Sequence, residues 1–260
     1  MRRSRPLFAL VVLAALVAGC GGGSGSTEDE STSRQQLENA GQKLTDADSF
    51  EVSLLIEGEE EDEESEELGC VRLGVDNRKP VSIDMRIYDL NCSGGTEGAE
   101  LIAIGNRAWA STDSGTWTAA KISPKLTKEL NDEQTTDLKG LFKAAEDIDE
   151  VSADDAVEER AAGGEAKAEF SFKAPASAFP GSEALGDSDV DFEATIDDKG
   201  FLTQLVLHGE AEGAGATATE TYERIDKPLG ISPPAASEVH GTVQKLDSKE
   251  ELEALLGAAF

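Results

Sequence analysis

The sequence predicts an α+β protein in which helices cover one side of an antiparallel sheet. Most segments alternate apolar and polar residues with a period of two, which is typical of half-buried strands. Short turn signals rich in Gly, Asn, Asp and Pro separate consecutive strands, which indicates hairpins and therefore antiparallel pairing. Only a few stretches have the three- and four-residue apolar spacing of helices, and they lie before, between and after the strand runs.

The first half of the chain is expected to form one helix and a run of hairpins. A helix is predicted over residues 34–47, where Leu37, Ala40 and Leu44 share one face. The alternating segments that follow are 50–56, 68–75, 81–88, 101–104, 107–111 and a strand that begins at Trp117. Gly105-Asn106 supplies a two-residue hairpin turn.

The second half is expected to begin with helices and return to strands. Residues 124–148 are predicted to be helical, with Leu138, Leu141, Phe142 and Ala145 as the clearest apolar stripe. Alternation then predicts strands over 166–173, 190–196, 201–207 and 216–222. A last helix over 248–259 opens with Ser248 and Glu251 in capping-box spacing.

The N-terminus has the pattern of an export signal. Three arginines in the first five residues precede an apolar run over 7–18, which is short for a membrane-spanning helix. Val17-Ala18-Gly19-Cys20 resembles a bacterial lipobox. That resemblance implies a diacylglyceryl thioether on Cys20, cleavage after Gly19, and acylation of the new N-terminus by a chain such as palmitate. The alternative is an ordinary signal, or a signal anchor, with a chance cysteine.

The expected organisation is therefore a signal peptide over 1–19, a flexible tether over 20–33, one domain over 34–240 and a helical extension over 241–260. Residues 21–33 contain no apolar side chain, so they cannot bury enough surface to offset the entropy of ordering. Three of the 23 Lys and Arg residues lie in the signal, which leaves 20 bases against 53 acids, a formal charge of −33. Such a charge argues against nucleic acid and anionic headgroups as partners.

Two cysteines remain if Cys20 carries lipid. A structural disulfide between Cys70 and Cys92 is the default in an oxidising compartment. A metal pair or a redox pair is the alternative, although the spacing is not C-x-x-C and no histidine or third cysteine is near.

Acidic residues suggest cation sites at two places. Residues 57–67 hold nine acids in eleven positions, which indicates either a cation site or a solvated, self-repelling loop, and we favour the loop. Residues 187–193 begin like a calcium-binding loop, but Phe192 stands where that loop needs glycine. Their apolar residues alternate at strand spacing, so we expect a strand and no metal site.

No catalytic set is recognisable in the sequence. There is no G-x-S-x-G, no H-E-x-x-H, no P-loop and no dinucleotide-binding loop. His208 and His240 stand alone, and His208 lies opposite the apolar face of its strand. We therefore expect a non-enzymatic protein without cofactor or metal.

Several stretches together resemble a known family. They are Leu101-Ile102-Ala103-Ile104-Gly105-Asn106-Arg107-Ala108-Trp109, Gly115-Thr116-Trp117, Ile196-Asp197-Asp198-Lys199-Gly200-Phe201-Leu202 and Asp226-Lys227-Pro228-Leu229-Gly230-Ile231-Ser232-Pro233-Pro234. Their order after the lipobox is similar to that of the LppX/LprAFG family of actinobacterial lipoproteins, relatives in fold of the LolA/LolB lipoprotein carriers. The resemblance implies a curved antiparallel half-barrel with helices packed on its concave side. It also implies a hydrophobic cavity for lipid or glycolipid acyl chains, and carriage of lipids within the cell envelope.

The expected function is that of a monomeric carrier, held by its lipid anchor on the extracytoplasmic face of the bacterial cell membrane. Thirteen apolar residues are predicted to face the cavity: Phe50, Val52, Leu54, Ile56, Ile83, Met85, Ile87, Trp109, Phe170, Phe172, Phe192, Leu205 and Leu207. The alternative is a cleft packed shut by the protein's own helices. A second hypothesis is an acidic, non-catalytic envelope module that binds a protein partner or cations through residues 57–67.

Overall fold

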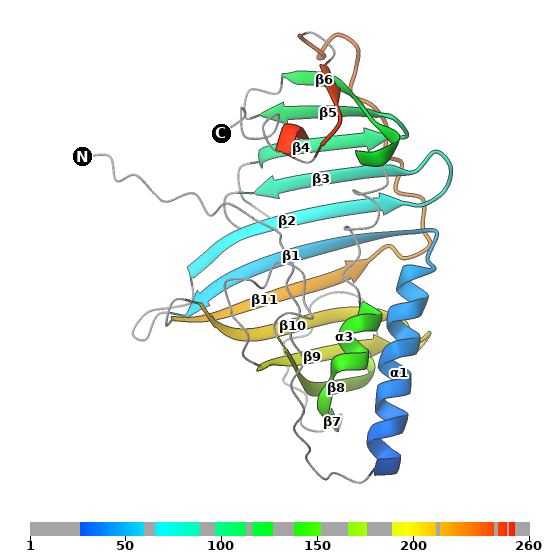
Figure 1. The fold of residues 1–260 in the computed structure, drawn as a ribbon, viewed down its shortest axis with the longest axis vertical. Helices are drawn as coiled ribbons and strands as arrows, with labels where there is room; N and C mark the ends of the chain where they lie inside the picture. Colours follow the sequence, from blue (N-terminus) through cyan, green and yellow to red (C-terminus); the bar gives the residue numbers. More distant parts are fainter. Residues whose placement is uncertain are drawn as a thin grey trace, which may run out of the picture.

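The computed structural model describes residues 27–59, 66–88, 97–112, 116–126, 138–151, 166–175, 189–211, 214–241, 244–248 and 250–252. These residues form one open sheet of twelve strands, with the helices α1 (Thr27–Thr45) and α3 (Leu138–Ala144) against one face of it (Figure 1). The strands are β1 (Ser49–Glu59), β2 (Glu66–Asp76), β3 (Ser82–Tyr88), β4 (Glu97–Ile104), β5 (Arg107–Thr112), β6 (Trp117–Ile122), β7 (Glu146–Val151), β8 (Ala166–Pro175), β9 (Asp189–Asp197), β10 (Leu202–Ala211), β11 (Ala214–Glu223) and β12 (Gln244–Leu246). The predicted fold class, a curved antiparallel half-barrel with helices on one side, is confirmed.

The sheet consists of two runs of neighbouring strands joined in its middle. Its order is β12-β6-β5-β4-β3-β2-β1-β11-β10-β9-β8-β7. Consecutive strands pair antiparallel within each run, and the first strand of the domain, β1, pairs antiparallel with β11. The parallel pair β12–β6 was not predicted, because three residues are too few to show a period in the sequence.

Strict alternation divides the sheet into two faces. We call the face on which α1 and α3 pack the inner face. Across the middle of the sheet this face carries Tyr222, Val52, Leu73, Met85 and Leu101, each opposite the next on neighbouring strands. The opposite, outer face carries mostly polar side chains there. A one-residue slip would exchange the two faces, so the apolar pattern fixes the register.

Helix α1 begins earlier than the sequence predicts, because Thr27–Ser33 of the expected tether are helical. An ion pair between Glu30 and Arg34, 2.9 Å long and four residues apart, supports this first part. Arg34 also donates hydrogen bonds to the carbonyls of Phe142, Lys143 and Ala145, at 3.4, 3.2 and 2.5 Å. It thereby satisfies carbonyl groups at the end of α3 that have no partner within the helix.

The predicted helical segment over 124–148 is wrong at its end. Helix α3 stops at Ala144, and β7 starts at Glu146 and pairs with β8. Asp147 has a φ of 51°, and the β7–β8 register shifts between Glu146 and Asp149. Ile148, the last residue of the predicted helical segment, is instead an inward-facing strand residue with 6% exposure. Residues 127–137 lie outside the described part of the chain.

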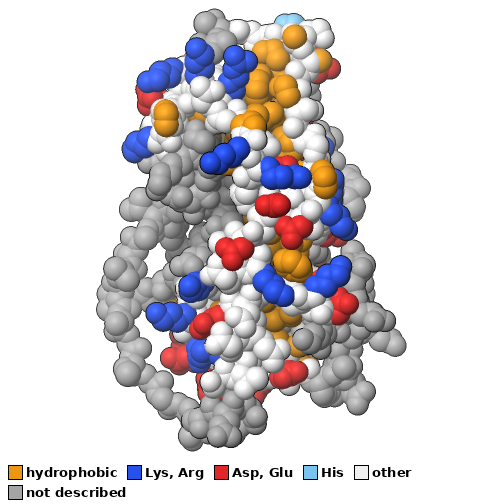
Figure 2. Space-filling model, turned by 90° about the vertical axis from the view of Figure 1, so that its right-hand side faces the viewer, with side chains coloured by type: hydrophobic (Ala, Val, Ile, Leu, Met, Phe, Trp, Pro, Cys, Tyr) orange, Lys and Arg blue, Asp and Glu red, His pale blue; other side chains and the backbone are white. Residues whose placement is uncertain are grey.

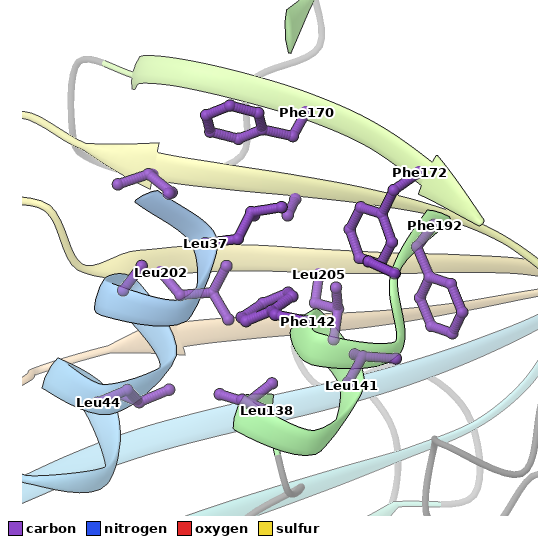
Figure 3. Close-up of a cluster of buried hydrophobic side chains, with 14 of the residues drawn as sticks. Leu37, Leu44, Leu138, Leu141, Phe142, Phe170, Phe172, Phe192, Leu202 and Leu205 are labelled. Carbon is purple, nitrogen blue, oxygen red and sulfur yellow. The ribbon is translucent and has the colours of Figure 1, made fainter. Parts of the chain in front are cut away.

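The inner face of β7–β11, the lower half of the sheet in Figure 1, carries a filled hydrophobic core, which we call the lower core (Figure 3). The Phe142 ring of α3 meets Phe172 edge-on with ring centroids 5.8 Å apart, and Phe172 stacks on Phe192 at 5.3 Å. Leu37 and Leu44 of α1 belong to the same cluster. Gly41 lets the two helices approach, because a Cβ there would lie 3.1 Å from both Leu138 Cβ and the Phe142 ring.

The upper half has a second, separate cluster, which we call the upper core. It joins inward-facing residues of β3–β6 to Leu126, Leu246 and Leu252. Within the predicted extension over 241–260, the described residues 244–246 join the sheet as β12, and Leu246 and Leu252 are buried in the upper core. The predicted helix start at Ser248 holds, since the Glu251 N–H donates to Ser248 Oγ at 3.4 Å. Residues 253–260 lie outside the described part.

Candidate functional site

Between the two cores, the inner face carries apolar side chains that belong to neither. We call Leu54, Ile56, Val71 and Ile87 the central strip. Leu54 lies opposite Val71, and Val71 lies opposite Ile87, so these three form one row across β1, β2 and β3. All four are half-buried, and neither core contains them. Apolar side chains arranged in this way form a surface that acyl chains could cover.

Seven of the thirteen predicted cavity residues are core residues. Phe50, Phe170, Phe172, Phe192, Leu205 and Leu207 face inward but are 1–4% exposed in the lower core, and Ile83 is 3% exposed in the upper core. The cause is the position of α1 and α3, whose leucines and Phe142 fill the space over β8–β10. Over this half of the sheet the protein's own helices fill the cleft, which was the alternative to an open cavity.

Five of the predicted residues remain candidates for ligand contact. Val52, Leu54, Ile56, Met85 and Ile87 are all half-buried and lie on the inner face. Val52 and Met85 border the strip, since Val52 packs against the lower core and Met85 against the upper core. Val71 was not among the predicted residues, although the alternation of its strand places it on the same face.

The prediction that Trp109 faces the cavity is wrong. Trp109 lies opposite Ile102 and Ala119, in the register that places Leu101 and Ala110 on the inner face. It is therefore on the outer face, together with Trp117 of the neighbouring strand. The sequence suggested that the largest side chain of β5 points to the core. The inner face there holds Ala108 and Ala110 instead, both 3% exposed or less.

A buried carboxylate on the inner face was missed. Glu220 is 9% exposed and lies opposite both Leu54 and Leu205, at the border of the central strip. The Tyr222 hydroxyl donates a hydrogen bond to it, and the Tyr222 ring lies 6.5 Å from that of Phe50. Counting every second residue back from Tyr222 identifies Glu220 as an inward position, which is the signal that the sequence offered.

The outer face of the middle strands is held by ion pairs. Glu51 lies 2.9 Å from Arg72 and 3.3 Å from Arg224, and Arg86 lies 3.2 Å from Glu100 and 3.3 Å from Asp84. Burial opposes the charge of Arg86, but its hydrogen bonds to Asp84 and the nearby acids together raise its pKa. The outer face is thus polar where the inner face is apolar.

Other predicted features stand as follows. Cys70 lies buried in β2, whereas Cys20, Cys92 and residues 60–65 of the acidic run lie outside the described residues, so lipidation and disulfide pairing stay predictions.

Residues 189–193 belong to β9, as predicted from their alternation. His208 is exposed, with Nδ1 3.3 Å from Thr217 Oγ1. Within the described ranges, no three His, Cys, Asp or Glu residues are grouped as metal ligands. In the same part of the chain, no helix is both long enough and apolar enough to cross a membrane.

The fold of this chain, an open antiparallel half-barrel with helices on its inner face, is shared with solved structures of two lipoproteins. The chain is similar in structure to LprF from Mycobacterium bovis, with a TM-score of 0.52 and 12% identity over 82% of this chain and 100% of that one. It is also similar to the lipoprotein LppX from Mycobacterium tuberculosis, with a TM-score of 0.50 and 11% identity over 78% of this chain and 99% of that one. These likenesses show the fold. Comparison of the sequence with protein-family profiles and with characterised proteins found no match.

Proposed function

We propose that this protein is a lipid-anchored, extracytoplasmic lipoprotein that binds acyl chains of lipid or glycolipid on its inner face and carries them within the cell envelope. The observation that carries the proposal is the central strip, a row of half-buried apolar side chains on β1–β3 that belongs to neither core. The LppX/LprF-type fold supports a lipid-related role, and the lipobox at Cys20 supports the anchor. The proposed role is one of binding and transfer, without catalysis.

Affinity would come from apolar contact. Covering the strip with an acyl chain removes hydrocarbon from water on both partners, at about 25 cal/mol per Å². A chain laid along the row formed by Leu54, Val71 and Ile87 crosses three strands, whose neighbours are about 4.8 Å apart. Because the lower and upper cores are already filled, the chain would bind between them.

Native mass spectrometry of protein exposed to membrane lipid tests the proposal. We expect a stoichiometric lipid adduct on the wild-type chain. The double variant Leu54→Gln/Ile87→Gln should lose it, because two amides would be buried without partners under the ligand. The matched control Ser53→Gln/Thr219→Gln changes the outer face of β1 and of its neighbour β11 and should keep the adduct. A wild-type chain without adduct, or equal adducts on all three proteins, would remove the proposal.

A further inference from the structure

Basic side chains gather at one end of the strands, although the chain has more than twice as many acids as bases. Arg107 begins β5, Lys121 lies near the end of β6 and Lys245 lies in β12. Arg78 and Lys79 form the β2–β3 turn at the same end of the sheet, where Arg78 is paired with Asp76 at 2.6 Å. We call these five exposed residues the cationic edge. Figure 2 views the molecule from this end and shows Lys and Arg side chains gathered at upper left, beside a band of hydrophobic side chains.

The register places three of these cations side by side. Arg107 lies directly opposite Lys121, and Lys121 lies directly opposite Lys245 on the next strand. Like charges in directly opposed positions repel and destabilise a sheet. Lys245 forms a 2.8 Å ion pair with Asp247, but no carboxylate of the described residues pairs with Arg107 or Lys121. A row that is unfavourable for folding, in a chain rich in acids, indicates an anionic partner.

The opposite end of the same strands is acidic. Glu57 of β1 lies opposite Glu67 of β2, next to the position where Gly58 lies opposite Glu66. Along β2 the residues therefore change from acidic at one end to basic at the turn that holds Arg78 and Lys79, although acids such as Asp48 and Asp226 lie beside the same ends of β1 and β11. The attraction of an anionic plane would therefore be local to the upper strands that carry the cationic edge.

We propose that the cationic edge docks the protein against an anionic lipid surface and orients it there, an inference that rests on the extracytoplasmic, lipid-anchored role proposed above. The row from Arg107 to Lys245 spans two strand spacings, about 10 Å, and the β2–β3 turn extends it, which suits a surface better than one small anion. Half-buried Trp109 lies two residues from Arg107 on the same face, and Pro80 and Pro124 are exposed nearby. Aromatic side chains among cations are typical of membrane–water interfaces. The overall negative charge argues against anionic headgroups, but the local charge at this edge has the opposite sign.

Of the two tryptophans of the chain, Trp109 lies two residues from Arg107 in β5 and reports on docking without a label, whereas Trp117 is 8% exposed at the other end of β6 from Lys121. The full-length protein would be mixed with phosphatidylcholine vesicles, or with vesicles that also contain phosphatidylglycerol, each with a nitroxide on some headgroups. Co-sedimentation gives the bound fraction, and tryptophan quenching gives the orientation of the bound protein. We expect strong quenching only with phosphatidylglycerol present, and its loss at high salt because exposed charges are then screened.

The double variant Arg107→Gln/Lys121→Gln should dock about 25-fold more weakly, since each basic residue near an anionic surface contributes about fivefold. Lys139→Gln/Lys173→Gln removes two exposed charges on α3 and β8 and should leave docking unchanged. Quenching that is the same on neutral vesicles, or the same in both variants and insensitive to salt, would overturn the proposal. Equal inhibition by a soluble polyanion, without preference for anionic vesicles, would reassign the edge to a different partner and also overturn it. Because the adduct experiment does not involve this edge, loss of the lipid adduct with intact docking would refute only the carrier function.

Discussion

Gly41 is the position where the packing of α1 against α3 is most directly testable. Replacing glycine by alanine in an exposed helix stabilises it by about 1 kcal/mol. At Gly41 the added methyl would lie 3.1 Å from Leu138 Cβ and from Phe142 Cε2, closer than carbon atoms normally approach. Neither neighbour can yield freely, because Leu138 is 3% exposed and Phe142 is 0% exposed.

We therefore expect Gly41→Ala to be destabilising. Overpacking costs about 1–3 kcal/mol, which offsets the helical gain and leaves a net loss of about 0–2 kcal/mol. Gly41→Val adds further volume and should lower the free energy of unfolding by more than Gly41→Ala does. Asn39→Ala, at an exposed position of the same helix, serves as the control and should be neutral or slightly stabilising. Urea unfolding gives the free energies. A gain of about 1 kcal/mol in Gly41→Ala, like that of an exposed site, would refute the close approach of the two helices.

Three further predictions concern single side chains. Arg34→Gln should cost about 1–2 kcal/mol, because carbonyls at the end of α3 lose charged donors; unchanged urea unfolding would contradict this. Asp197→Ala should cost about 1 kcal/mol, because Asp197 Oδ1 accepts N–H groups of Lys199 and Phe201 at 3.0 and 2.8 Å. Asp197→Asn keeps a hydrogen-bond acceptor, so it should lower the melting temperature less than Asp197→Ala does. The hydrogen bond with Arg78 lowers the pKa of Asp76, so its stabilisation is present above the ordinary carboxyl pKa and is lost as pH falls through the lowered value. The difference in stability between wild type and Asp76→Asn should then be largest near neutral pH and vanish in acid. If the stability difference between wild type and Asp76→Asn grew as the pH fell, the predicted direction of the pH dependence would be wrong.

Period-two alternation predicted ten of the strands and their common face, because burial on one side repeats every second residue. The same reasoning could not separate the core from the site. Phe192 and Leu54 have the same pattern in the sequence, yet Phe192 stacks on Phe172 beneath α3 and Leu54 remains half-buried. That difference depends on where two helices lie in space. The three-residue β12 was missed because so few residues cannot show a period, and β7 was missed because its first residues were assigned to the helical segment that ends at Ile148.

Choosing a face from side-chain size failed at Trp109. The β5 strand has alanines on one side and larger residues on the other, and size suggested that the tryptophan points inward. The neighbouring strands decide otherwise, since Leu101 and Ile122 already fill the upper core and leave room only for small side chains beside them. The cationic row was equally invisible in the sequence, because Lys245 meets Lys121 only through a parallel pair between distant segments.

The pairing of β1 with β11 has a consequence for how the chain is made. The Asp48 amide donates to Asp226 Oδ1, a contact between residues 178 positions apart. A nascent chain therefore releases β1 long before the strand that completes it, and contacts of such separation fold slowly. During that interval β1 has an open edge with apolar side chains on one face, an arrangement prone to intermolecular pairing. Truncation before Ala214 would leave that edge open permanently, so loss of the C-terminal fifth should produce aggregation rather than a smaller folded domain.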